Sequence, residues 1–192
     1  MIPFRTRCRS SPCPVAYERW PVAVQSAEAL RGSLLRCGPG YRPLGCPETP
    51  EARAAALTQF LRSVGVREPL IAHARTAAWV WGACRGAPPR LQLATGTGVR
   101  ARSPAFHECL EVRQLSFEPA DLVRIGTLRV TGPLRTAADL LRSPAGFPRE
   151  SRIACRMLTC ALPGGTRQLT AELRQGPRHF RRLALARIGA AK

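Results

Sequence analysis

The chain has 192 residues, 45% of them hydrophobic, and its 30 basic and 12 acidic residues give a net charge of +18. Such a charge favours polyanionic partners. No apolar run is long enough to span a membrane, and the basic first 14 residues lack the apolar segment of a secretory signal, so we expect a cytoplasmic protein. The single lysine, Lys192, excludes a P-loop and Schiff-base chemistry, because both need a lysine inside the chain.

The cysteine and acidic residues indicate neither a metal site nor a cofactor. No Cys-x-x-Cys sequence occurs, and two cysteine pairs, 8/13 and 155/160, have four intervening residues, which is loose for zinc. We therefore expect reduced cysteines that pack as small hydrophobic residues. Acids and histidines are few and do not cluster at catalytic spacings, so the sequence predicts a binding protein and not an enzyme.

Three segments follow one another along the chain. Residues 1–19 are rich in proline and arginine and are expected to form a disordered basic tail. Residues 20–47 contain a short helix, with Ser26 as its cap and Gly32 as its end. Two strand-like pieces then flank Gly38-Pro39-Gly40, which predicts a hairpin.

Residues 48–192 are expected to form the main domain. Thr49 and Pro50 predict the start of a helix that runs to Leu61, and a second helix is expected from Leu70 to Trp81. Alternating patterns predict strands at 90–95, 110–115, 122–125 and 128–131. The fold class is therefore α+β, a small, mostly antiparallel sheet bracketed by helices.

The helix expected at 134–142 follows a strand and a Gly-Pro turn. Pro133 suits the first helical position, and Thr131 is a candidate cap. Arg135 and Asp139 share one face, one turn apart. An arginine in the first turn is unfavourable to the helix dipole, so we expect Arg135 to have a partner beyond the helix, either Glu111 or Asp121.

The C-terminal part is predicted to be helical at 150–161, at 166–175 with Thr166 as cap, and at 177–188. The last helix is basic and amphipathic, which suits either nucleic acid or an acidic groove. Alternatively, its arginines are solvated while its apolar side packs on the body. A basic turn at 96–102 precedes the second strand.

Arginines in these exposed segments are the candidate DNA contacts, because guanidinium groups bind phosphates. The alternative is that they only solvate the surface. The candidates are Arg31, Arg36, Arg42, Arg100, Arg102, Arg178, Arg181 and Arg182.

Two motifs about fifty residues apart carry a family resemblance: a Thr-Ala-Ala-Trp-x-x-Gly segment, and the segment from Thr131 to Leu141. In this order they resemble the AbiEi-type antitoxins of type IV (abortive-infection) toxin–antitoxin systems, over roughly residues 34–142. The motif residues, to which we assign a structural role, are Thr76, Trp79, Gly82, Thr131, Pro133, Arg135, Thr136 and Asp139.

The resemblance implies an N-terminal winged helix-turn-helix that binds DNA and a domain that antagonises a nucleotidyltransferase-type toxin. The hairpin matches the family's wing at Leu35, Arg36, Gly38, Gly40 and Tyr41. Only about one helix fits between residue 22 and the hairpin, where a winged helix normally has three, so the module is expected to be reduced. The alternative function is a stand-alone basic domain that binds nucleic acid or protein without sequence specificity or a toxin partner.

Overall fold

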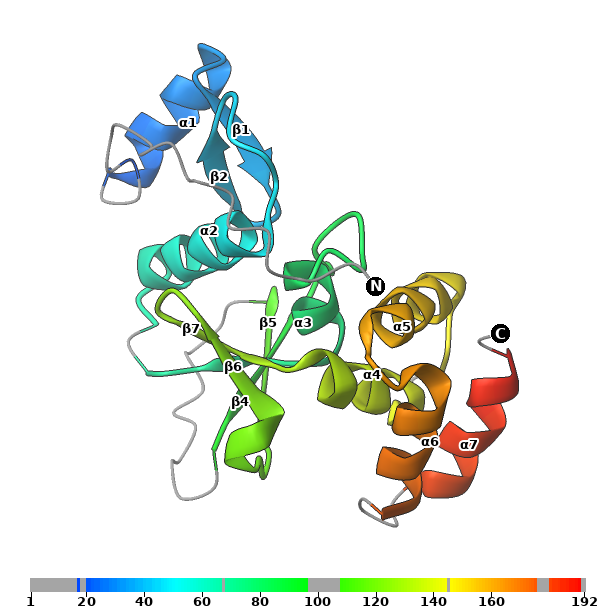
Figure 1. The fold of residues 1–192 in the computed structure, drawn as a ribbon. Helices are drawn as coiled ribbons and strands as arrows, with labels where there is room; N and C mark the ends of the chain where they lie inside the picture. Colours follow the sequence, from blue (N-terminus) through cyan, green and yellow to red (C-terminus); the bar gives the residue numbers. More distant parts are fainter. Residues whose placement is uncertain are drawn as a thin grey trace.

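The computed structural model describes residue 17 and residues 20–66, 68–96, 108–144, 146–175 and 180–190. Figure 1 shows a helix–hairpin unit at the top, a sheet below it and a group of helices on the right. The helices are α1 (Val22–Leu30), α2 (Pro50–Ser63), α3 (Ala74–Val80), α4 (Pro133–Arg142), α5 (Arg149–Ala161), α6 (Gly165–Gln175) and α7 (Arg181–Ala190), with a 3-10 turn, η2, at Pro119–Asp121. The strands are β1 (Leu34–Cys37), β2 (Gly40–Pro43), β3 (Ile71–Ala72), β4 (Leu91–Thr95), β5 (Leu110–Gln114), β6 (Leu122–Ile125) and β7 (Leu128–Thr131).

The main sheet has the strand order β5-β4-β3-β7-β6. Two neighbouring pairs are antiparallel, β3–β4 and β6–β7, and two are parallel, β3–β7 and β4–β5. The α+β class is therefore confirmed, but the sheet is mixed where we expected it to be mostly antiparallel. Alternating residues indicate a strand but not its direction, and the connection at 96–109 is long enough for the crossover that parallel neighbours require.

The helix predicted from Leu70 to Trp81 was wrong in its first four residues. Ile71 and Ala72 form β3 at the centre of the sheet, paired with β4 on one side and β7 on the other. The helix begins only at Ala74. The strand has two residues, too few to show an alternating pattern, and pairing with both neighbours overrides the local helical tendency.

Helix α3 lies between two hydrophobic cores. Its Trp79 and Val80 pack with α2 and the sheet, while Ala78 packs with α4 and the helices that follow. All three side chains are fully buried. Because α3 contributes to both cores, it links the sheet to the C-terminal helices.

The N-terminal module consists of α1 and the β1–β2 hairpin, with a small cluster of its own around Tyr17, Leu34 and Tyr41. The expected hairpin is present, but α1 begins at Val22 and not at Ser26. The Ser26 hydroxyl instead lies 3.1 Å from the hydroxyl of Tyr41 and joins α1 to β2. The Ser26 side chain therefore makes a contact between α1 and β2 and does not cap the helix.

The hairpin rests on the body through two glycines. A Cβ atom on Gly38 would lie 2.4 Å from the Trp79 ring, and one on Gly40 would lie 2.5 Å from the carbonyl oxygen of Ala56 in α2. Real Cβ atoms essentially never approach so closely. The glycines of the wing-like sequence are therefore required by packing.

The predicted cap of α2 is confirmed, since the Thr49 hydroxyl accepts a hydrogen bond from the amide of Ala52 at 3.2 Å. The cap predicted for α6 is wrong, because α6 begins at Gly165 and Thr166 lies inside the helix. The helix expected at 177–188 is α7, which begins at Arg181, and residues 176–179 lie outside the described part. Among the described residues, no helix has the length and apolarity needed to cross a bilayer.

Candidate functional site

The carbonyl oxygen of Thr131 connects the two sequence motifs. It accepts a hydrogen bond from the indole N–H of Trp81 at 2.8 Å and another from the Thr136 hydroxyl at 2.9 Å. Trp81 belongs to the first motif, whereas Thr131 and Thr136 belong to the second. Segments fifty residues apart therefore meet at one buried atom, where β7 leads into α4.

Thr131 does not cap α4, contrary to our expectation. Its hydroxyl lies 2.8 Å from the Thr136 hydroxyl. Since the Thr136 proton goes to the Thr131 carbonyl, the Thr131 hydroxyl is the donor in this pair. Gly132 occupies the cap position without a side-chain bond, and Pro133 is the first helical residue, as expected.

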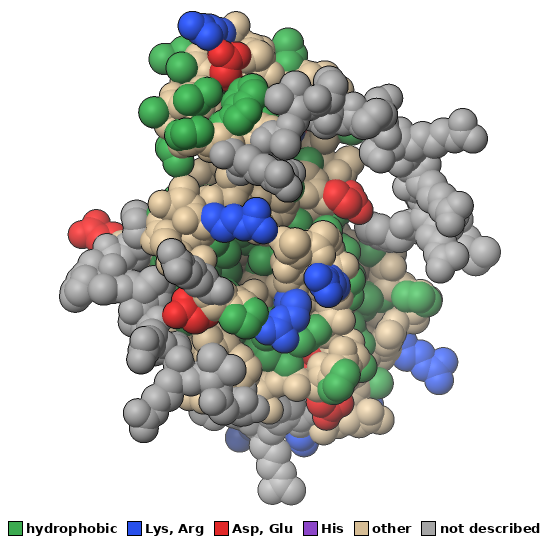
Figure 2. All heavy atoms as spheres, turned by 90° about the vertical axis from the view of Figure 1, so that its left-hand side faces the viewer, with side chains coloured by type: hydrophobic (Ala, Val, Ile, Leu, Met, Phe, Trp, Pro, Cys, Tyr) green, Lys and Arg blue, Asp and Glu red, His purple; other side chains and the backbone are tan. Residues whose placement is uncertain are grey.

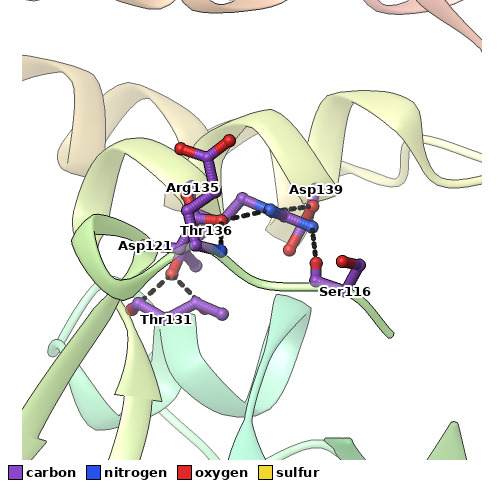
Figure 3. Close-up of polar contacts among 7 residues, drawn as sticks. Ser116, Asp121, Thr131, Arg135, Thr136 and Asp139 are labelled. Carbon is purple, nitrogen blue, oxygen red and sulfur yellow. Dashed lines mark hydrogen bonds and ion pairs between the residues drawn. The ribbon is translucent and has the colours of Figure 1, made fainter. Parts of the chain in front are cut away.

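Arg135 is the centre of a network at the start of α4 (Figure 3). Its Nε donates to Asp139 at 2.9 Å, and its Nη1 donates to Asp121 at 2.6 Å. Nη2 reaches the carbonyl of Ser116 at 3.4 Å, and the guanidinium lies 5.2 Å from the centre of the Phe117 ring. Asp121 is thus the partner expected beyond the helix.

The other expected partner, Glu111, pairs with Arg113 at 2.5 Å. Asp121 also accepts a hydrogen bond from the amide of Glu118 at 3.0 Å, and its carbonyl accepts the amide of Gly132 at 2.7 Å. The Arg135 network therefore fixes η2 and the start of α4 together.

Burial governs the electrostatics of this network. It opposes the charge of Arg135, but the carboxylates of Asp139 and Asp121 outweigh it and raise the pKa of the guanidinium. Burial also raises the pKa of Asp139, against the pull of Arg135. One oxygen of each carboxylate is bound by Arg135, whereas Oδ2 of Asp139 is buried without a hydrogen-bond partner. The arrangement suits a structural junction.

The remaining motif residues also lie in the body. The Thr76 hydroxyl accepts the amide of Gln92 in β4 at 2.7 Å, and the Gln92 side chain accepts the amide of Arg75 at 3.0 Å, which caps α3. Trp79 is fully buried. Gly82 has a φ of +83° directly after α3, a conformation that glycine adopts most easily.

The hairpin arginines differ in how they are used. Arg31 pairs with Glu28 at 2.7 Å, and Arg42 donates to the carbonyls of Pro43 and Cys46. Arg36 lies exposed over the Tyr41 ring, 5.1 Å from its centre. Within the described residues, no carboxylate or carbonyl partner of Arg36 is found.

The other predicted DNA contacts do not join the hairpin. Arg181 is half-buried and Arg182 is exposed on α7, which lies at the opposite end of the molecule from β1 and β2 (Figure 1). Arg100, Arg102 and Arg178 lie outside the described residues. Figure 2 shows basic side chains at several separate places on the face viewed, and not as one continuous patch.

Arg53 is a structural residue that the sequence analysis missed. It is 8% exposed, lies 5.7 Å from the centre of the Trp79 ring and pairs with Glu48 at 2.9 Å. Its Nη1 donates to the carbonyls of Trp79 and of Cys84, so it caps the end of α3. The spacing of Arg53 could have indicated its burial, because residue 53 shares the helix face of the apolar residues 56, 57 and 60.

Arg187 of α7 caps the end of α4 in a similar way. Its Nη1 donates to the carbonyls of Leu141 at 2.9 Å and of Ser143 at 2.6 Å, and the guanidinium lies 5.4 Å from the centre of the Phe147 ring. One arginine of the basic helix therefore holds the helix to the body.

His73 and the cysteines complete the ionisable groups of interest. Burial, and next the charge of Arg113, lower the pKa of His73 to about 4, so it is neutral at pH 7. Burial raises the pKa of Cys37 and of Cys155 to about 11, so both thiols stay protonated. In the described part of the chain, no three His, Cys, Asp or Glu side chains are grouped to hold a metal.

Comparison with known proteins finds no family model and no curated sequence that matches this chain. The resemblance to AbiEi-type antitoxins therefore depends on the motif residues alone.

Proposed function

We propose that the chain is a DNA-binding regulator of the AbiEi antitoxin type, which contacts DNA through the β1–β2 hairpin and antagonises a nucleotidyltransferase-type toxin. The observation that carries the DNA-binding part is Arg36, an exposed arginine on the β1–β2 hairpin of a protein with a net charge of +18. A guanidinium so presented binds backbone phosphate.

The hairpin is suited to this role because it is held firmly. Gly38 and Gly40 pack against Trp79 and α2, and Tyr41 supports the guanidinium of Arg36 from below. Little side-chain or backbone freedom is then lost on binding, which favours affinity.

Helix α1 takes no part in the phosphate contacts that we propose. Its exposed side chains include Val22, Val24 and Leu30, and its sequence has no basic residue. Hydrophobic side chains accordingly gather on the upper part of the molecule in Figure 2. Binding through the hairpin, as a wing, is the arrangement that remains for this module.

The test is fluorescence anisotropy with the DNA upstream of the chain's own gene and a scrambled duplex of equal length, across a salt series. The proposal predicts tighter binding to the native fragment that persists at physiological salt. Equal and steeply salt-sensitive binding to both duplexes would contradict sequence recognition.

A stand-alone basic domain without sequence specificity is the second candidate. It is favoured by the separation of the basic residues, since Arg36 belongs to β1 and Arg182 to α7, and these two elements lie at opposite ends of the molecule (Figure 1). The same salt series decides between the two functions.

A further inference from the structure

A cleft of about 490 Å³ lies between α5 and the loop that follows α3. Its volume is in the range of ordinary ligand sites, and its walls are mainly apolar. On the loop side it is lined by Ala87, Pro88 and Pro89, and on the helix side by Ile153.

The cleft continues along α5. A smaller hollow of about 80 Å³ shares Ala83 with it and is lined by Trp81 and Met157. Ile153 and Met157 are one helical turn apart and are 45% and 52% exposed. We call the two hollows and these two side chains the α5 groove.

The surroundings of the α5 groove are strongly basic. Arg75 and Arg85 line the cleft, and three exposed arginines of α5 flank the apolar side chains: Arg149, Arg152 and Arg156. Glu150 is the acid at the rim, where it pairs with Arg75 at 2.5 Å, and its side chain is 73% exposed. A carboxylate from outside can replace Glu150 without entering the body.

Three kinds of occupant have to be weighed. A second copy of this chain would bring the same arginines against one another, because a two-fold contact repeats each patch. A phosphate backbone would match the charge but would leave Ile153 and Met157 in water. An acidic segment with aliphatic side chains satisfies both features, since its carboxylates meet the arginines and its side chains fill the hollows.

We propose that the α5 groove docks an acidic, amphipathic segment of a partner protein. This inference goes beyond the proposed function and is independent of its DNA-binding part, which concerns a different surface. The segment buries aliphatic side chains against Ile153 and Met157, and its carboxylates pair with Arg75 and Arg85 in place of Glu150.

The chain provides a direct probe of this groove, because its two methionines are Met1 and Met157. The full chain is labelled with ¹³C at the methionine methyl groups and titrated with a short helix-forming peptide of glutamates and alanines that carries two leucines one turn apart. We expect the Met157 resonance to shift and saturate while the Met1 resonance stays in place. A matched peptide with serines for the leucines should leave Met157 unchanged.

Two variants and one control sharpen the test. Ile153→Ser should weaken binding of the leucine peptide about tenfold, as expected for loss of one buried aliphatic contact. Glu150→Gln should tighten it, because the competing carboxylate is gone. Val123→Ser, an exposed apolar residue on β6 that lies outside the groove, should have no effect.

Several results would overturn the docking proposal. They are equal binding of the serine peptide, unchanged affinity in Ile153→Ser, a Met157 shift that depends on protein concentration without peptide, and a Met157 shift caused by a DNA duplex. The last two would assign the groove to a second copy or to nucleic acid. Affinity of the hairpin for DNA is measured separately and does not affect this outcome.

Discussion

Arg36 in the hairpin and Arg135 in the body both lie over an aromatic ring, but the two guanidinium groups have different surroundings. Arg135 is 18% exposed on its side chain and donates to two carboxylates and a carbonyl. Arg36 is exposed, and its one partner among the described residues is the ring of Tyr41. Arg53 and Arg187 resemble Arg135, since each combines a ring with carbonyl acceptors. Part of the high positive charge therefore stabilises the fold, and net charge alone does not locate a binding surface.

The largest expected effect is the removal of Arg53. Arg53→Ala should lower the free energy of unfolding by about 3 to 4 kcal/mol, because it leaves Glu48 and the carbonyls of Trp79 and Cys84 without their partner. Chemical denaturation measures the change. Arg62→Ala, an exposed residue of the same helix, is the control and should stay within about 0.5 kcal/mol. Equal effects of the two variants would show that Arg53 does not stabilise the fold.

The body should also lose stability in mild acid through His73. The pKa of His73 is about 4 in the folded chain and about 6.5 when unfolded. The unfolded state then binds more protons, so stability is complete above pH 6.5 and falls as the pH drops toward 4, by up to about 3 kcal/mol. Denaturant unfolding from pH 7 to 4 should show a flatter profile in His73→Asn than in the unchanged chain. Parallel profiles would show that His73 is not buried in its neutral form.

Arg135→Ala should cost about 2 kcal/mol, since the buried carboxylate of Asp139 loses its main donor. Arg135→Lys should have a stability between those of Arg135→Ala and the unchanged chain. A lysine keeps the charge but cannot bind both carboxylates with a planar fork. The control is Arg31→Ala, which breaks an exposed ion pair and should cost under about 1 kcal/mol. If Arg135→Ala has unchanged thermal stability, the network is not structural.

Gly40→Ala tests how the hairpin is held to α2. The new Cβ would collide with the carbonyl oxygen of Ala56, and we expect a loss of about 2 kcal/mol, as is typical of overpacking. Gly86→Ala meets no atom within 4 Å and should be neutral within about 0.5 kcal/mol. Both variants are compared by thermal unfolding, and a neutral Gly40→Ala would mean that the hairpin is free of the body.

The elements that could be predicted from sequence are those with local signals. Thr49 and Pro50 determine the start of α2, and Gly38-Pro39-Gly40 determines the hairpin turn. Strand β3 could not be predicted, because two residues become a strand only through pairing with β4 and β7. The parallel or antiparallel direction of the strands could not be predicted either, because it depends on the connections between strands and not on the periodicity within them.

One contact of the candidate site could be predicted, because a residue there departs from a local preference of helices. Arg135 opposes the helix dipole, and this indicated a partner outside α4, which is Asp121. The pair between Glu28 and Arg31 has a local signal that the sequence analysis did not use, since the two residues are three apart at the end of α1. The use of Arg42 was not predictable, because the carbonyl of Cys46 reaches it only in the folded chain. The sequence alone could not rank the candidate DNA contacts, whereas the structure distinguishes the exposed Arg36 from Arg31, which pairs with a carboxylate, and from Arg42, which donates to carbonyl oxygens.

The most direct test of this account compares DNA affinity in Arg36→Ala and Arg62→Ala, each of which removes one exposed arginine. Binding of the native duplex is followed by fluorescence anisotropy across a salt series. If Arg36 contacts a phosphate, Arg36→Ala should weaken binding several-fold and reduce the salt slope by about one unit, while Arg62→Ala changes neither. Identical affinities and slopes for both variants would contradict DNA contact by the hairpin.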